Sequence, residues 1–339
     1  MKTKLLSTLT MFLCLNLIYS QQAITSDLKE VIPQEAIDAI SEITEITSVF
    51  SVGNDEHFDG QIIRANEIVF SENARLTLDN VDAPWIVLIA DKIKFQNPNK
   101  PARIMFGSTD INIPPKATTG SNGANGSGRS GRHGRPGAHG QTGTTGTKGY
   151  TKSLPHIYII TKELTSPTGS PAFAPLAILG NGFRGSQGGQ GGNGGNGGNG
   201  VKGQDSSSGA FDCRRGGGNG GNGGNAGQGG KGGDGGNGGD GVSITVVSNS
   251  SSNDAFSYIQ LLNSGGIGGP GGSPGIAGNP GASGGMGRGG GHCSGGRSGS
   301  SGSVPNRTNL EYGSEGKTGK KGSFTLVTAP DLESIFENN

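Results

Sequence analysis

Arginine and histidine side chains, together with one phenylalanine, gather beside two cysteines in the glycine-rich part of the chain. The set comprises Phe211, Arg214, Arg215, Arg288, His292 and Arg297, and the cysteines are Cys213 and Cys293. Guanidinium groups bind sulfate, phosphate and carboxylate through charge-assisted hydrogen bonds. These residues therefore suggest a site that binds an anionic group on a glycan. The alternative is that they only keep exposed loops soluble.

No arrangement of residues indicates catalysis, a metal or a cofactor. The histidines, which are His57, His133, His139, His156 and His292, show no ligand spacing. Carboxylates for acid–base chemistry on a polysaccharide are available at Asp79, Asp82, Asp91 and Glu163, but the sequence does not pair them. We expect turn and solvent roles for these acids, and we expect the protein not to be an enzyme.

Glycine occupies every third position in four stretches, which are Gly128–Gly149, Gly182–Gly203, Gly218–Gly239 and Gly266–Gly290. A polyproline-II-type helix has three residues per turn and makes no internal hydrogen bonds, so its backbone needs neighbouring helices. Glycine in each turn leaves a bare face along which backbones can approach, and each stretch would reach roughly 70 Å. The spacing predicts a bundle of antiparallel polyglycine-II helices. Disorder, a collagen triple helix and a calcium-binding β-roll are the alternatives.

Short apolar runs between these stretches predict the rest of the fold. Runs of β type over 51–106 repeat about every twenty-odd residues, and we expect a β-solenoid-like body, with a β-sandwich as the alternative. Later strands within 156–179, 242–262 and 323–328 are expected to join it. Helical spacing of isoleucines within 21–50 predicts a short N-terminal helical cap.

The order of strands and glycine stretches predicts three hairpins that leave one end of the body and return to it. Both cysteines then fall at the far tip, where a disulfide between Cys213 and Cys293 would join two hairpins. The stretch Gly218–Gly239 is mostly Gly-Gly-X and should lie centrally, because two glycines per triplet bare two faces. The stretch Gly128–Gly149 is mostly Gly-X-X and should lie at an edge.

The N-terminus predicts export. Lysines precede a short apolar stretch in residues 1–20, which is typical of a signal peptide and too short for a membrane span. A net charge of +1 argues against a general nucleic-acid or membrane partner. The expected domains are 1–20 signal peptide, 21–50 cap, 51–106 body, 107–322 glycine-rich bundle with interleaved body strands, and 329–339 tail.

The runs 188–196 and 217–241 resemble the glycine-rich tip adhesins of phage long tail fibres, which form polyglycine-II sandwiches. They are also similar to mycobacterial PGRS domains and to springtail antifreeze proteins. The resemblance implies a rigid bundle whose loops or flat face bind something.

Taken together, the sequence predicts a secreted, non-enzymatic adhesion or recognition protein that binds an extracellular or cell-surface glycan through distal loops. The alternatives are ice binding, for which Thr142, Thr144, Thr145 and Thr147 would be candidates, a structural matrix role, and a polysaccharide-active enzyme that uses the β-body.

Overall fold

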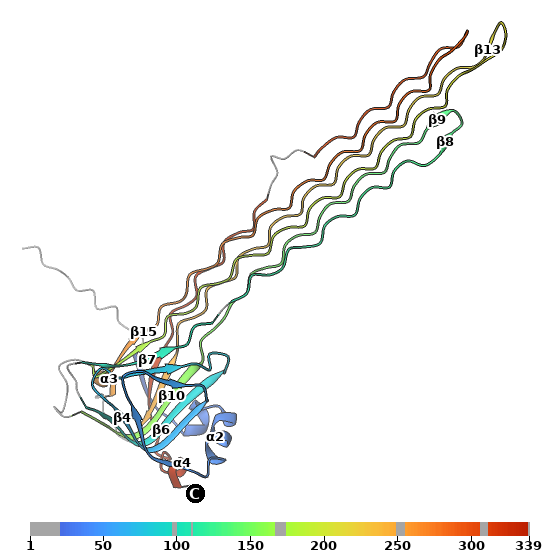
Figure 1. The fold of residues 1–339 in the computed structure, drawn as a ribbon. Helices are drawn as coiled ribbons and strands as arrows, with labels where there is room; N and C mark the ends of the chain where they lie inside the picture. Colours follow the sequence, from blue (N-terminus) through green and yellow to red (C-terminus); the bar gives the residue numbers. More distant parts are fainter. Residues whose placement is uncertain are drawn as a thin grey trace, which may run out of the picture.

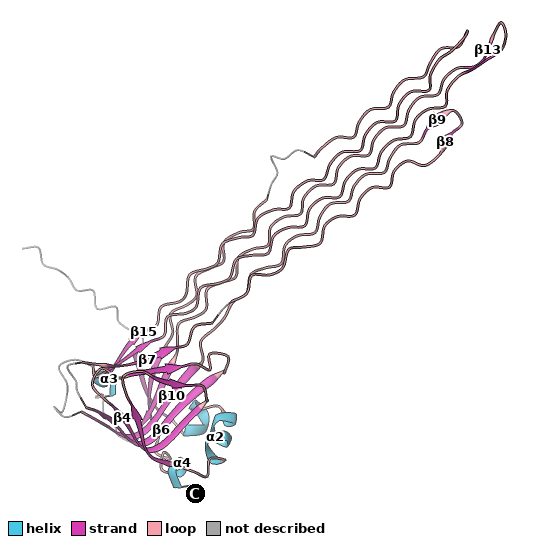
Figure 2. Ribbon diagram, viewed as in Figure 1, coloured by secondary structure: helices cyan, strands magenta, loops and turns pink. Residues whose placement is uncertain are grey.

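Two parallel β-sheets form the body of the protein, and a long glycine-rich bundle projects from one of its ends (Figure 1). The computed structural model describes residues 21–96, 100–109, 111–166, 174–248, 255–305 and 311–337. The expected signal peptide, 1–20, lies outside these residues. Figure 2 shows that strands make up most of the body, whereas the bundle is almost entirely extended chain without regular sheet or helix.

The larger sheet has seven strands in the order β1-β16-β14-β10-β6-β4-β2, and every pair is parallel. Its strands are β1 (Gln21–Thr25), β2 (Thr47–Val52), β4 (Ile62–Phe70), β6 (Trp85–Phe95), β10 (His156–Thr165), β14 (Ile244–Ser248) and β16 (Phe324–Thr328). The central strands β6 and β10 contain continuous apolar runs in their first halves, over 85–90 and 157–160, which is typical of parallel strands that are covered on both faces.

The smaller sheet has five strands in the order β15-β11-β7-β5-β3, again all parallel. Its strands are β3 (Glu56–Phe58), β5 (Arg75–Leu78), β7 (Ala102–Phe106), β11 (Leu176–Leu179) and β15 (Ile259–Leu262). A one-turn helix, α3 (Ala255–Tyr258), precedes β15. Apolar side chains from both sheets, such as Leu88, Ile159 and Ile178, form one buried core between them.

Helices from both ends of the described chain cover the outer face of the larger sheet. They are α1 (Leu28–Val31), α2 (Gln34–Ser41) and α4 (Ser334–Glu337). Ala36 and Ile40 are buried one helical turn apart on α2, and they belong to a second core with Val87 and Ile89 of β6. The buried guanidinium of Arg64 donates to the carbonyl of Ile40 at 2.7 Å, which gives this carbonyl at the end of α2 a second donor beside the N–H of Ile43.

The glycine-rich chain forms six extended legs in the described residues. Leg 1 (117–126) and leg 2 (132–150) make the first hairpin, leg 3 (181–204) and leg 4 (216–241) the second, and leg 5 (264–288) and leg 6 (294–305 and 311–322) the third. Odd-numbered legs run away from the body and even-numbered legs return, so the predicted course of three hairpins is observed (Figure 1).

The legs lie in two rows. Legs 1, 3 and 5 form the outgoing row, and Gly194 of leg 3 donates its N–H to Ile276 of leg 5 at 2.8 Å, between chains that run in parallel. Legs 2, 4 and 6 form the returning row, which is also parallel. Between the rows the chains are antiparallel, as where Gly195 donates to Gln141 at 2.8 Å. We call the exposed surfaces of these rows the outgoing face and the returning face.

Glycine content follows the number of neighbours. Legs 3 and 4 each exchange backbone hydrogen bonds with four other described legs, and they carry the Gly-Gly-X repeats. Leg 1 and leg 6 are bonded to two neighbours each and largely carry Gly-X-X. The central position expected for Gly218–Gly239, which lies in leg 4, is therefore confirmed.

The structure corrects the expected fold class. A β-solenoid-like body was expected, whereas the body is layered: two parallel sheets pack face to face, and helices cover one outer face. The bundle was expected to be antiparallel, whereas neighbours within each row are parallel. The expectation was wrong because spacing along the chain shows where strands occur but not how they pair. The cap segment 21–50 also supplies the edge strand β1 and most of β2.

Candidate functional site

Three tight turns meet at the end of the bundle that is farthest from the body. The first turn joins β8 (Arg129–Ser130) to β9 (His133–Gly134), the second joins β12 (Ser207–Ser208) to β13 (Cys213–Arg215), and the third is closed by a bridge between Gly290 and Cys293. Gly128, Gly131 and Gly291 adopt positive φ angles in these turns, which side chains would disfavour. Figure 1 shows the first turn ending short of the second.

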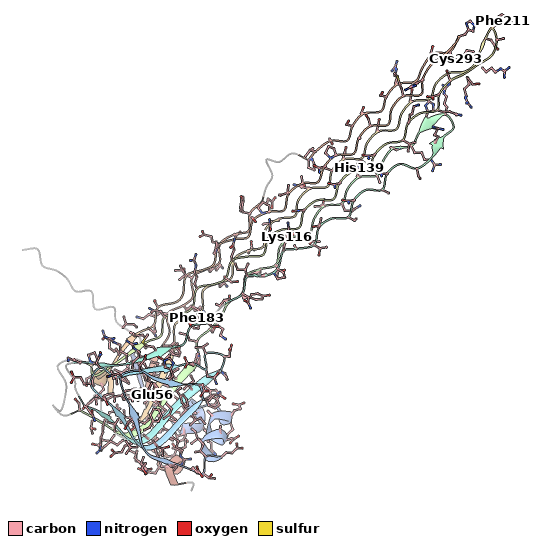
Figure 3. The ribbon with its side chains drawn as sticks, viewed as in Figure 1. Glu56, Lys116, His139, Phe183, Phe211 and Cys293 are labelled. Carbon is pink, nitrogen blue, oxygen red and sulfur yellow. A yellow bond between two sulfur atoms is a disulfide. The ribbon has the colours of Figure 1, made fainter. Side chains whose placement is uncertain are left out.

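The disulfide between Cys213 and Cys293, which the sequence predicted, is confirmed and has a Cα–Cα distance of 4.9 Å. It joins the turns of the second and third hairpins. Figure 3 places Cys293 and Phe211 at the far end of the bundle, while Glu56 lies in the body at the other end. The covalent link adds to hydrogen bonds between the same two hairpins, such as the one that the Ser208 hydroxyl donates to the carbonyl of Gly290.

The predicted site residues all lie at this tip, but they do not form a single cluster. Phe211 is 92% exposed at the point of the second turn. Arg214 and Arg215 are exposed on β13, and His292 is exposed in the third turn.

The remaining two predicted residues lie on opposite rows. Arg288 belongs to leg 5 of the outgoing row, and Arg297 belongs to leg 6 of the returning row. The tip therefore presents two different surfaces, which spacing in the sequence did not reveal.

Polar side chains in the outward position of each triplet connect neighbouring legs. On the outgoing face, Asn122 accepts the backbone N–H of Asn196 at 2.8 Å, and Asn196 accepts that of Asn279 at 2.8 Å. On the returning face, Asn222 accepts the N–H of Ser300 at 2.9 Å. These side chains thus satisfy N–H groups of non-glycine residues, while the glycine N–H groups bond to neighbouring carbonyls. Glycine spacing alone did not predict this role, although the regular Gly-Gly-Asn repeat is its signal in the sequence.

A carboxylate occupies the same outward position near the tip of the outgoing face. Asp205 accepts the N–H of Arg288 at 2.7 Å and pairs with Lys202 at 2.9 Å. The backbone hydrogen bond from Arg288, and then the hydrogen bond from Lys202, hold the pKa of Asp205 below its ordinary value. The outgoing face of the tip therefore carries a compensating negative charge.

The body carboxylates that were considered for catalysis all form ion pairs with a base. Asp79 contacts His57 at 2.8 Å. The other three pairs join Asp82 to Lys152, Asp91 to Lys162, and Glu163 to Lys92. The hydrogen bond from Asp79, followed by its charge, raises the pKa of His57. These pairings agree with turn and surface roles.

The threonines considered for ice binding are divided between surfaces. Thr144 donates its hydroxyl to the carbonyl of Thr118 on leg 1 at 3.1 Å, at the edge of the slab. Thr142 and Thr145 follow the register of His139, whose Nδ1 accepts the Asn225 N–H on the returning face. The four residues therefore do not form one flat array.

Two further features are absent from the described ranges. No three histidine, cysteine or acidic side chains come together as metal ligands there. Within the same part of the chain, no helix is both long and apolar enough to cross a membrane.

Comparisons with known proteins assign no family to this chain. No family model matches the chain, and no curated protein matches it. Among solved structures, a springtail antifreeze protein from Granisotoma rainieri, a nine-helix polyproline type II bundle, shares 24% sequence identity. The match covers 55% of this chain and 92% of the antifreeze protein, with a TM-score of 0.10. At that TM-score the likeness carries no argument about function, and the resemblance to phage adhesins and PGRS domains has no matching family behind it.

Proposed function

We propose that this protein is an exported, non-enzymatic recognition protein that holds its distal turns out toward an anionic glycan on an extracellular or cell surface. One observation supports this most: cations and an exposed aromatic ring gather on turns that a disulfide joins, at the end of a long bundle. In the body, the four carboxylates considered for catalysis each form an ion pair with a base.

The physical basis of the proposed recognition is that the turns are held in place before a ligand binds. Each leg exchanges backbone hydrogen bonds with its neighbours along its length, so little conformational freedom remains to be lost when a ligand binds the turns. Arg214 and Arg215 supply charge-assisted donors, and Phe211 supplies an apolar surface for stacking on a sugar ring.

A glycan array tests the proposal. The parent protein should bind a subset of acidic glycans, and the double variant Arg214→Ala/Arg215→Ala should lose most of that signal. The matched control is Lys317→Ala/Lys320→Ala, which removes the same charge from leg 6 near the body and should retain binding. Equal binding by parent and Arg214→Ala/Arg215→Ala would refute the role of the turns. Glycan cleavage or thermal hysteresis by the parent would instead favour an enzyme or an ice-binding protein.

A further inference from the structure

The first hairpin ends beside the second and leaves one arginine on the returning face. The carbonyl of Arg132 accepts the N–H of Gln204 at 2.9 Å, which fixes the level at which the hairpin turns. Gly216 lies three residues before Asn219, in the outward position of leg 4, and has no side chain. The Nη1 atom of Arg132 lies 3.8 Å from the point that a Cβ on Gly216 would occupy. The guanidinium therefore covers leg 4 where glycine leaves room.

A transverse row of side chains brings a second arginine to this surface. Nδ1 of His133 accepts the backbone N–H of Asn219 at 3.0 Å, and Oδ1 of Asn219 accepts that of Arg297 at 2.9 Å. Legs 2, 4 and 6 are thereby joined at one level. Because Nδ1 of His133 is an acceptor, a neutral imidazole carries its proton on Nε2 and can donate there. The side-chain Nδ2 of Asn219 takes part in neither of these two bonds.

Charge differs between the two faces of the tip. Asp205 lies in the outgoing row, where it pairs with Lys202 and binds the backbone of Arg288. In the described residues, neither Arg132 nor Arg297 forms an ion pair with a carboxylate. Within the described residues, the returning face of the tip therefore carries two guanidinium groups that form no ion pair, whereas Asp205 offsets part of the positive charge on the outgoing face.

We propose that Arg132 and Arg297, with His133 and Asn219 between them, form an anion-binding site on the returning face of the tip. The inference rests on the proposed function, and it names the ligand class as a glycan with several anionic groups. The backbones of Arg132 on leg 2 and Arg297 on leg 6 are two leg spacings apart across the slab, because leg 4 lies between them, which is roughly 10 Å. Two guanidinium groups at that separation can each bind a different sulfate or carboxylate of one chain. Arg132 was not among the residues that the sequence predicted.

Binding to dextran sulfate, with neutral dextran as the uncharged probe, tests the site. We expect the parent to bind dextran sulfate at low salt, to lose affinity as salt is raised, and not to bind dextran. Arg132→Ala and Arg297→Ala should each weaken binding about tenfold, since each removes a charge-assisted contact. Arg184→Ala, an exposed arginine of leg 3 near the body, should bind like the parent. Circular dichroism should confirm that all variants are folded.

The outgoing arginine separates this inference from the proposed function. Arg288→Ala should weaken dextran sulfate binding less than Arg297→Ala does. If Arg288→Ala is the more damaging variant, or if Arg132→Ala has no effect, the returning-face site is wrong while recognition by the tip stands. If the tip binds only neutral glycans on the array, the inference also fails and the proposed function survives in part. If the parent binds neither array glycans nor dextran sulfate, both proposals fail.

Discussion

The backbone N–H of Gly180 donates to the carbonyl of Leu262 at 2.8 Å, at the point where β11 and β15 end and legs 3 and 5 begin. The next bond, from Gly182 to Ser264 at 2.9 Å, continues the same pairing into the bundle. On the other row, Gly241 donates to Lys320 and Ile244 to Ser323, so legs 4 and 6 continue into β14 and β16. The outgoing row thus extends the small sheet, and the returning row extends the large one. Parallel strands lie about 4.8 Å apart, and the body thereby aligns the legs before the first glycine triplet.

Close packing in the middle of the slab should make a central glycine indispensable. A Cβ added to Gly194 would lie 2.1 Å from the carbonyl oxygen of Gly227, so Gly194→Ala must push two legs apart. We expect a loss of about 1–3 kcal/mol in the free energy of unfolding. The matched control is Gly285→Ala, whose Cβ would meet only a side-chain atom of Lys202 at 3.8 Å. Thermal unfolding followed by circular dichroism measures both, and equal melting temperatures would contradict the packing.

Asparagine side chains should matter as acceptors for backbone N–H groups. Asn222→Ala leaves the N–H of Ser300 without its partner and should cost about 1 kcal/mol. Asn222→Asp keeps an acceptor oxygen at the same place and should cost less. Amide hydrogen exchange at Ser300 gives the direct measurement, with faster exchange expected in Asn222→Ala only. Similar exchange in the two variants would show that the side chain does not hold leg 6.

Removing the disulfide should loosen the tip and leave the body intact. The bond closes a loop with a sequence separation of 80 residues, and its loss should cost about 2–4 kcal/mol. In Cys213→Ser/Cys293→Ser, hydrogen exchange should rise in the turns, while the buried strands β6 and β10 stay protected. Glycan binding should weaken because only hydrogen bonds then hold the second and third turns together. A variant that binds as tightly as the parent would show that the turns are positioned without the bond.

Acid should destabilise the body through one partly buried histidine. Burial lowers the pKa of His156 to about 4, and its Nε2 contacts the hydroxyl of Thr245 at 2.8 Å. The unfolded chain takes up this proton near pH 6.5 while the folded chain does not, so stability falls as the pH drops from about 6.5 to about 4. The full effect is about 3 kcal/mol at most.

Urea unfolding across this pH range, compared between the parent and His156→Gln, measures that contribution. The glutamine can still bond to Thr245 but cannot take up a proton, so the variant should lose less stability than the parent. An identical pH dependence in the two proteins would assign the acid sensitivity to other groups.

Several features of the fold could be predicted from the local sequence pattern alone. The threefold glycine spacing specifies extended legs, because a backbone with three residues per turn and no internal bonds must find partners alongside. The alternation of glycine stretches with apolar runs also determined that three hairpins leave and rejoin a β-rich body. That order placed Cys213 and Cys293 at the same end, and their disulfide followed from it.

Other features depend on contacts between residues distant in the sequence, and only the tertiary structure decided them. Nothing near β10 in the chain indicates that it pairs with both β6 and β14, and so the layered body was not foreseen. The same holds for the division of the legs into parallel rows. Arg132 reaches the tip surface only because the first hairpin is shorter than the second and because Gly216 has no side chain there. The repeat pattern of a segment determines that its backbone requires neighbouring partners. Packing across the whole molecule determines which segments become those partners.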